Sequence, residues 1–176
     1  MNQLDAPSAD PSDSSQLARI PTGNPQADEI LGGGFPVDSI NVVMGQPGTG
    51  KTIFIEQLIF HNAGDDRPIL YLTTMSEPLP KVVRYLQQFP FFNEEKIGTE
   101  VVYEDIGAEL AAGGIDALVP RVQESVKTLG PKIIVIDSFK AIHDLAPSVP
   151  AMRKMLYELS GLLSAYEATT FLVGEY

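Results

Sequence analysis

The most specific pattern in this chain is the stretch Gly45-Gln46-Pro47-Gly48-Thr49-Gly50-Lys51-Thr52. It fits the pattern G-x-x-x-x-G-K-[ST] without a mismatch. Glycines allow the backbone to curl so that its N–H groups point inward and form a nest for an anion. Lys51 can reach the outer phosphates of a nucleotide, and the Thr52 hydroxyl can bind Mg²⁺. The stretch therefore predicts a phosphate-binding loop and disfavours the alternative, a glycine-rich turn with an exposed lysine.

The segments on either side of the loop have the character that such a loop requires. Ser39–Met44 is apolar and β-branched, which is typical of a buried strand, and Thr52–Ala63 carries apolar residues at helical spacing. Gly64 follows at the position where a helix cap is expected. A helix that begins near Lys51 directs the positive end of its dipole at bound phosphates.

The rest of the chain alternates short apolar runs with amphipathic stretches. Further strands are expected at Pro68–Thr73, Glu100–Tyr103, Lys132–Ile136 and Thr169–Val173. Further helices are expected at residues 118–129, closed by Gly130-Pro131, and at residues 152–166. Near-continuous apolar strands suit a parallel sheet that is buried on both faces. We therefore expect a doubly wound α/β fold, with ligands at the carboxyl ends of its strands.

A carboxylate for the metal follows one of these strands. Four consecutive aliphatic residues, Ile133–Ile136, precede Asp137, so this side chain should emerge where the sheet meets the ligand. The alternative is an acidic residue that caps the next segment. The pairing of this pattern with the phosphate-binding loop favours a magnesium site formed by Thr52 and Asp137.

The residue after Asp137 is Ser138 and not Glu, so a carboxylate that activates water must come from another strand end. Glu77 follows the strand at Pro68–Thr73 closely and is the first candidate. A solvated loop residue is the equally weighted alternative for it. Other acidic residues lie after the remaining strands: Glu104, Asp105 and Glu175.

Composition and net charge argue against several classes of protein and of functional site. The chain has 176 residues and a formal net charge of −11, which argues against tight nonspecific binding to a nucleic-acid backbone. It has no cysteine, which excludes disulfides, thiolate zinc sites and cysteine nucleophiles. No apolar run is long enough for a membrane span, and the start of the chain does not resemble a secretory signal. A cytoplasmic protein is the default expectation.

The chain divides into two parts. Residues 1–18 are rich in Asp, Ser, Ala and Pro, so we expect a flexible acidic tail. Residues 19–176 are expected to form one domain. The chain stops at Glu175-Tyr176, directly after an apparent central strand, so we expect a sheet whose C-terminal strands are missing. Such a sheet exposes a strand edge and part of its core, which predicts low stability for this chain on its own.

The segment before the loop carries a specific resemblance. Residues 22–36, which read TGNPQADEILGGGFP, resemble the entry segment of KaiC-like ATPases in the RecA superfamily. The likeness extends through the loop and the predicted strands to the end of the chain. It implies a RecA-like P-loop NTPase with a mostly parallel sheet and helices on both faces. It also implies ATP and Mg²⁺ as ligands, and a homo-oligomeric ring or filament with ATP sites between neighbouring subunits.

The resemblance implies that Lys51 and Thr52 contact phosphate and metal, and that Asp137 supports the metal. Members that hydrolyse ATP typically carry two adjacent glutamates after the second strand. Here Met75 and Ser76 stand at those positions, and Glu77 comes one residue later. Two further departures are Ala27, where a larger apolar residue is usual, and Asp38, where glycine is common.

Three functional hypotheses follow. The first is an oligomeric regulatory or signalling switch that hydrolyses ATP slowly, with Lys51 neutralising charge and Glu77 polarising water. The second is a module that binds protein partners in a nucleotide-dependent way and does not hydrolyse ATP; Met75-Ser76 favours it. The third is a paralogue of DNA recombinases, which the net charge of −11 disfavours.

Overall fold

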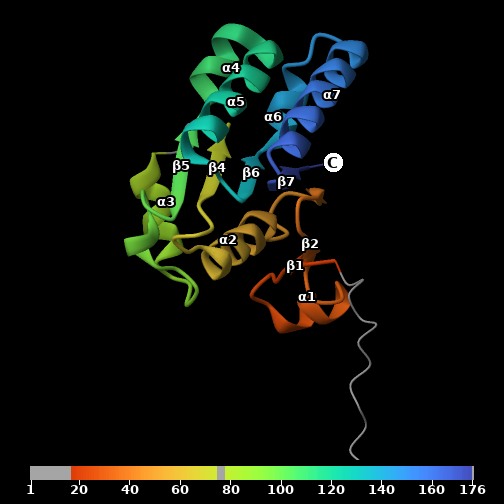
Figure 1. The fold of residues 1–176 in the computed structure, drawn as a ribbon. Helices are drawn as coiled ribbons and strands as arrows, with labels where there is room; N and C mark the ends of the chain where they lie inside the picture. The colour runs from red at the N-terminus through yellow and green to blue at the C-terminus, as the bar shows by residue number, and fades with distance from the viewer. Residues whose placement is uncertain (1–16, 75–77, 176) are drawn as a thin grey trace, which may run out of the picture.

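The computed structural model describes residues 17–74 and 78–175, so Met75, Ser76 and Glu77 lie outside the described residues. Five parallel strands form one sheet in the order β3-β7-β6-β4-β5 (Figure 1). These strands are β3 (Ile40–Met44), β4 (Ile69–Thr73), β5 (Val101–Asp105), β6 (Ile133–Asp137) and β7 (Thr169–Gly174). All five correspond to strands predicted from the sequence. However, β5 runs to Asp105, so Glu104 and Asp105 belong to the strand and do not follow it.

Helices cover both faces of the sheet, as the fold class predicts (Figure 1). On one face lie α2 (Lys51–Asn62) and α3 (Leu79–Leu86). On the other lie α4 (Gly107–Gly113), α5 (Leu118–Leu129), α6 (Phe139–Asp144) and α7 (Val149–Ala165). Two 3-10 turns, η1 (Glu94–Lys96) and η2 (Gly114–Ala117), complete the connections. The sequence predicted α2, α5 and α7, and the short helices α3, α4 and α6 were not anticipated.

Alternate residues of each strand face opposite helical layers. Leu72, Ile136 and Leu172 pack into the core beneath α5 and α7, whereas Tyr71 and Phe171 pack beneath α2. Because the strands pair in register, Thr73, Asp137 and Asp105 share one row at the carboxyl end of the sheet. That row has the same parity as Tyr71, so these three side chains belong to the α2 face.

The C-terminal ends of α5 and α2 are capped in different ways. Gly130 closes α5 in the left-handed conformation (φ 63°), as predicted from the sequence. The prediction for Gly64 is wrong, because α2 is capped by Ala63 in an extended conformation. Gly64 instead forms an isolated bridge with Arg67 in the turn that leads to β4.

The segment that carries the family resemblance folds into a small unit beside α2. Strand β1 (Arg19–Ile20) pairs antiparallel with β2 (Phe35–Pro36), and α1 (Pro25–Ile30) lies between them in the chain. Gly34 sits where β2 approaches β1, with φ at 112°, and a side chain there would collide with the Ile20 carbonyl oxygen. Only glycine fits this position, which explains the last residue of the glycine triplet.

Two amides on α2 hold this N-terminal unit. Gln57 Nε2 donates to the Gly23 carbonyl oxygen at 2.7 Å, and Asn62 Nδ2 donates to the Pro21 carbonyl oxygen at 2.7 Å. The helix that starts at the phosphate-binding loop therefore also anchors the segment that precedes β3.

The backbone conformation of Asp38 accounts for the glycine that is common at this position. Its backbone is left-handed (φ 59°), which glycine adopts without strain and Asp tolerates better than most residues.

Strand β3 forms an edge of the described sheet. Its side chains Val42 and Met44 are 60% and 49% exposed, on the face that α5 and α7 cover elsewhere. Apolar surface therefore lies along this edge of the described sheet. None of the helices in residues 17–74 and 78–175 combines the length and apolar character needed to cross a membrane.

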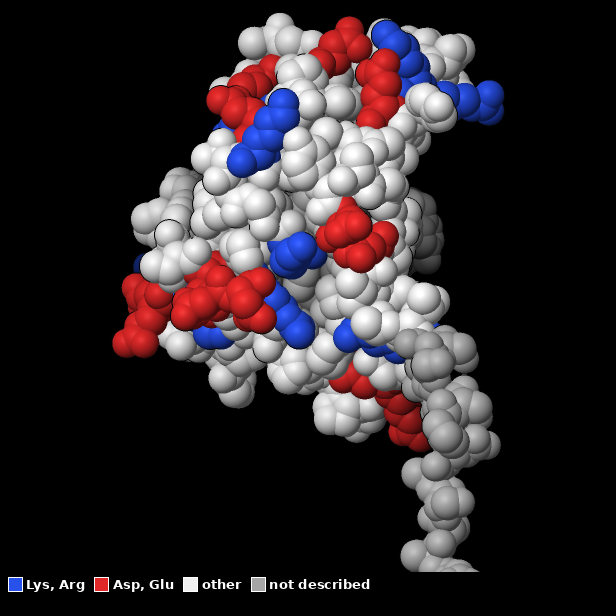
Figure 2. Space-filling model, viewed as in Figure 1, with Lys and Arg blue, Asp and Glu red and all other residues white. Residues whose placement is uncertain are grey.

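Acidic and basic side chains are distributed differently over the surface. On the face shown in Figure 2, Asp and Glu side chains form several groups, whereas Lys and Arg side chains are scattered among other residues. No continuous basic surface is visible on this face of the described chain. This arrangement agrees with the net charge of −11.

A buried carboxyl group lies in the layer beneath α2. Glu56 is 1% exposed, and its Oε2 accepts a hydrogen bond of 2.7 Å from the Tyr103 hydroxyl on β5. Burial raises the pKa of Glu56 from 4.5 to about 8, although the hydrogen bond from Tyr103 opposes this shift. Burial also raises the pKa values of Tyr103 and Tyr71, so both phenols keep their protons and act as donors.

This carboxyl group predicts a pH dependence of stability. Between pH 4.5 and about 8, folded protein holds a proton on Glu56 that the unfolded chain has released. Stability therefore falls as pH rises through this window, by up to about 5 kcal/mol. In Glu56→Gln the titration is gone and the acceptor for Tyr103 remains. We expect its free energy of unfolding to match wild type near pH 4 and exceed it above pH 8, as measured by denaturant unfolding.

Glu158→Gln is the matched control, because Glu158 is an exposed carboxylate on α7. It should leave the pH profile of wild type unchanged. Parallel profiles for wild type and Glu56→Gln would show that Glu56 does not hold a proton in the folded state.

Candidate functional site

The phosphate-binding loop lies between the end of β3 and the start of α2. Gly48 and Gly50 have φ values of 77° and 86°, so the backbone turns at two points that L side chains rarely tolerate. Gly50 is the N-cap of α2 and offers no side-chain acceptor to the helix. The first amides of α2 consequently remain available, and they combine with the helix dipole to favour an anion at this point.

Lys51 and Thr49 both contact the loop itself. Lys51 Nζ donates to the Gln46 carbonyl oxygen at 2.8 Å, and Thr49 Oγ1 donates to the same oxygen at 2.8 Å. Lys51 Nζ also lies 4.0 Å from Glu175 Oε1 at the end of β7. Its ammonium group is thus held over the loop, at the rim of a hollow of 260 Å³.

Thr52 and Asp137 meet beside this hollow. Thr52 Oγ1 donates to Asp137 Oδ2 at 2.9 Å, although the two residues are 85 positions apart in the chain. The pair offers a hydroxyl oxygen and a carboxylate, which are the hard oxygen ligands that Mg²⁺ prefers. The donor set therefore fits a magnesium ion. The structure brings together the two residues that the sequence singled out for the metal.

A third side chain in this cluster was missed in the sequence. Tyr71 donates its hydroxyl to the same Asp137 oxygen, Oδ2, at 2.8 Å. Burial raises the pKa of Asp137, and the hydrogen bonds from Tyr71 and Thr52 and the charge of Lys51 act in the opposite direction. The available signal was a tyrosine inside the aliphatic run ILYLT, because a buried phenol must find a polar partner.

The ends of β4 and β6 are joined by backbone and side-chain contacts. Thr74 N donates to the Asp137 carbonyl oxygen at 3.0 Å. The Thr74 hydroxyl accepts from Ser138 N at 2.9 Å and donates to the Ser138 carbonyl oxygen at 3.1 Å. These contacts fix the turn that follows Asp137, so the carboxylate is presented from a rigid support.

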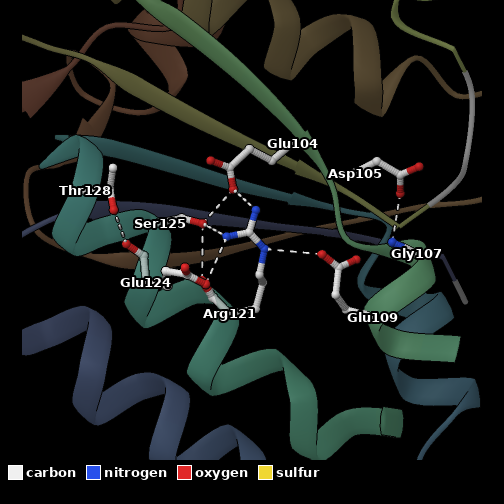
Figure 3. A network of polar contacts seen from close by, with 8 residues as sticks. All are labelled: Glu104, Asp105, Gly107, Glu109, Arg121, Glu124, Ser125 and Thr128. Atoms are coloured by element: carbon white, nitrogen blue, oxygen red, sulfur yellow. Dashed lines mark hydrogen bonds and ion pairs between the residues drawn. The ribbon is translucent and has the colours of Figure 1, made fainter. Parts of the chain in front are cut away.

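The acidic residues named as candidates for activating water lie in different places. Glu104 faces the α5 layer, where its Oε2 accepts from Arg121 at 2.8 Å and from Ser125 at 2.6 Å (Figure 3). It is therefore turned away from the phosphate-binding loop. Asp105 lies on the α2 face, and its Oδ1 accepts from Gly107 N at 2.8 Å. Glu175 lies beside Lys51, and Glu77 falls outside the described residues.

A larger cavity of 570 Å³ adjoins the hollow at the loop. The two share Thr52, Ile53, Tyr85 and Asp137 as lining residues. Side chains of α3 form a wall that is apolar except for Lys81, and Glu56, Tyr71, Tyr103 and Asp105 add polar groups to the lining. The cavity thus extends from the metal-binding side of the loop along the α2 face of the sheet.

Comparisons with known proteins give relatives across nearly the whole chain. The circadian clock oscillator protein KaiC of Prochlorococcus marinus is 27% identical over 168 residues, covering 91% of this chain and 33% of that protein. A UPF0273 protein of Thermotoga maritima is 28% identical over 173 residues, covering 90% of this chain and 70% of that protein. This chain therefore spans about a third of the length of the KaiC relative.

The fold has a counterpart among solved structures. A crystal structure of a KaiC-like protein from Pyrococcus horikoshii superposes with a TM-score of 0.73 at 27% identity, covering 92% of this chain and 73% of that chain. A family model described as the ATPase KaiC matches residues 20–176. This match includes the N-terminal unit, the phosphate-binding loop and the strand that ends at Asp137. The chain therefore belongs to the KaiC ATPase family, whose domain is a nucleotide-binding ATPase domain of the RecA-like P-loop fold.

Proposed function

We propose that this chain binds ATP together with Mg²⁺ and acts as an oligomeric regulatory switch that hydrolyses the nucleotide slowly. The observation that carries the proposal is the hydrogen bond of 2.9 Å between Thr52 and Asp137. It sets a hydroxyl and a carboxylate side by side at the edge of an anion nest. Membership of the KaiC ATPase family supports the same reading.

Each residue of the site has a defined part in this proposal. The backbone N–H groups of residues 45–50, except that of Pro47, which has none, and those at the start of α2 bind the phosphates. Lys51 moves from the Gln46 carbonyl oxygen to the outer phosphates and neutralises their charge. Thr52 and Asp137 would hold Mg²⁺, which would supply positive charge against the phosphates of the nucleotide.

Hydrolysis then needs one correctly placed water molecule. Its oxygen forms a bond to the γ-phosphorus while the bond from this phosphorus to the β–γ bridging oxygen breaks. ADP leaves with the electron pair of the broken bond. We assign the proton of the attacking water to Glu77, the first carboxylate after β4 in the sequence. The products are ADP and inorganic phosphate.

Met75 and Ser76 support a second candidate function, in which the chain binds ATP and changes its protein contacts without turnover. Neither side chain can accept a proton from water at neutral pH, and glutamates are typical of hydrolysing members at these positions. In this case nucleotide binding alone drives the switch. Both candidates share the ring or filament of identical subunits that the family resemblance implies. The scattered basic residues on the face in Figure 2 make DNA the less favoured partner.

The assignment of the phosphate site makes a prediction for Lys51. Replacing it in Lys51→Ala removes the positive charge at the loop, so ATP affinity should fall by about 10- to 100-fold. Isothermal titration calorimetry with a non-hydrolysable ATP analogue measures this directly. Lys127→Ala removes an equal charge from an exposed position on α5 and should leave the affinity unchanged. Equal affinities for wild type and Lys51→Ala would refute the assignment of the phosphate site.

A prediction for Glu77 separates the two candidate functions. If the chain is an enzyme, Glu77→Gln should lower the rate of phosphate release by about 10²- to 10⁴-fold, since the amide cannot accept the proton. Affinity for the non-hydrolysable analogue should stay close to that of wild type. Glu158→Gln removes an exposed carboxylate on α7, so it serves as the control and should keep the wild-type rate. Binding without phosphate release in any of the three proteins would identify the non-hydrolysing module.

A further inference from the structure

Tyr71 has no part in the function described so far, yet it contacts the site directly. It lies in the middle of β4, is 4% exposed and donates its hydroxyl to Asp137 Oδ2 at 2.8 Å. A buried phenol that lost this acceptor would be left without a partner at a cost of about 1–3 kcal/mol. The contact therefore constrains both side chains.

The ring of Tyr71 is held from the side. It packs on the ring of Tyr103, with centroids 5.0 Å apart and planes at 33°. Tyr103 is itself fixed, because its hydroxyl donates to Glu56 Oε2 on α2 at 2.7 Å. Strand pairing places Tyr71 opposite Val135, two residues before Asp137 on β6. The phenol is thus aimed along its strand at the carboxylate by contacts from two neighbouring strands.

Both hydrogen bonds to this carboxylate end on the same oxygen. Thr52 Oγ1 and the Tyr71 hydroxyl each donate to Oδ2. In the described part of the chain, no residue donates a hydrogen bond to Oδ1. Two donors on one oxygen fix the rotation of the carboxyl group, whereas Thr52 alone, which must also offer its lone pairs to a cation, leaves that rotation less restricted.

We propose that Tyr71 is a positioning residue for the divalent cation, because its hydroxyl orients Asp137 through Oδ2. The proposal rests on the proposed function, since it assumes that Thr52 and Asp137 receive a cation together with the nucleotide. Groups that orient a metal ligand typically change metal affinity by 10- to 100-fold when they are removed. Tyr71 acts through Asp137, so its effect should appear in cation dependence and not in nucleotide binding as such.

The test uses the whole chain and compares Tyr71→Phe with Tyr157→Phe, because Tyr157 is an exposed tyrosine on α7. Both variants lose one hydroxyl and keep the ring, but only the first hydroxyl contacts Asp137. Binding of a non-hydrolysable ATP analogue is measured by calorimetry in EDTA and across a series of Mg²⁺ concentrations. We expect Tyr71→Phe to bind the metal-free analogue as wild type does and to need about 10- to 100-fold more Mg²⁺ for its full effect. Tyr157→Phe should keep the Mg²⁺ dependence of wild type.

A second arm tests the route of the effect. In an Asp137→Asn background, adding Tyr71→Phe should produce no further change in Mg²⁺ dependence, because the group through which it acts has been altered. An unchanged Mg²⁺ requirement in Tyr71→Phe alone would overturn the proposal. So would loss of metal-free binding in that variant, since Tyr71 would then support the fold and not the cation.

The experiment also distinguishes a failure of this proposal from a failure of the proposed function on which it rests. If wild type binds no analogue with or without Mg²⁺, the proposed function fails, and the role of Tyr71 falls with it. If wild type shows a Mg²⁺-dependent gain in affinity that Tyr71→Phe retains, only the role of Tyr71 is wrong.

Discussion

The hydrogen bond from Thr52 to Asp137 is the contact on which the site depends, and strand order together with strand register makes it possible. Thr52 belongs to the helix that follows β3, whereas Asp137 ends β6, two strands away in the sheet. The chain passes outward through β4 and β5 and returns inward through β6 and β7. A slip of β6 by one residue would turn Asp137 to the α5 face, because side chains alternate along a strand. The strand register that forms the sheet therefore also places Asp137 beside Thr52.

The cores on the two faces of the sheet differ in how many polar side chains they contain. Beneath α5 and α7 the core is a continuous apolar cluster, and its charged network around Arg121 lies at the margin. Beneath α2 the core admits Glu56, Tyr71 and Tyr103 among its apolar residues. Burying such groups is costly unless each finds a partner. The two hydrogen-bonded pairs, Glu56 with Tyr103 and Asp137 with Tyr71, line the cavity that adjoins the phosphate-binding loop. The polar layer therefore holds the side chains beside the loop in fixed positions.

The sequence predicts those features whose signal is local. Apolar runs predict all five strands of the sheet, and the loop pattern followed by the aliphatic run before Asp137 predicts where two parts of the site lie. Tyr71 was missed because its partner is set by strand register, which periodicity does not reveal. The helix α3 was missed because its eight residues follow Pro78 and contain Pro80, and tertiary packing of Val82 and Leu86 decides its state. Similarly, β5 continues through Glu104 and Asp105, acidic residues that rarely signal a strand.

The acidity of the chain and its affinity for a polyanion do not conflict, because they act over different distances. At physiological ionic strength, exposed charges more than about 8 Å away are largely screened. The loop supplies inward-pointing amides, the dipole of α2 and the ammonium group of Lys51 within contact range of a phosphate. The divalent cation that we propose for Asp137 would add two further positive charges at the same place. A nucleic-acid backbone, in contrast, must be neutralised phosphate by phosphate along an extended surface. The same net charge of −11 is therefore compatible with a nucleotide and unfavourable for DNA.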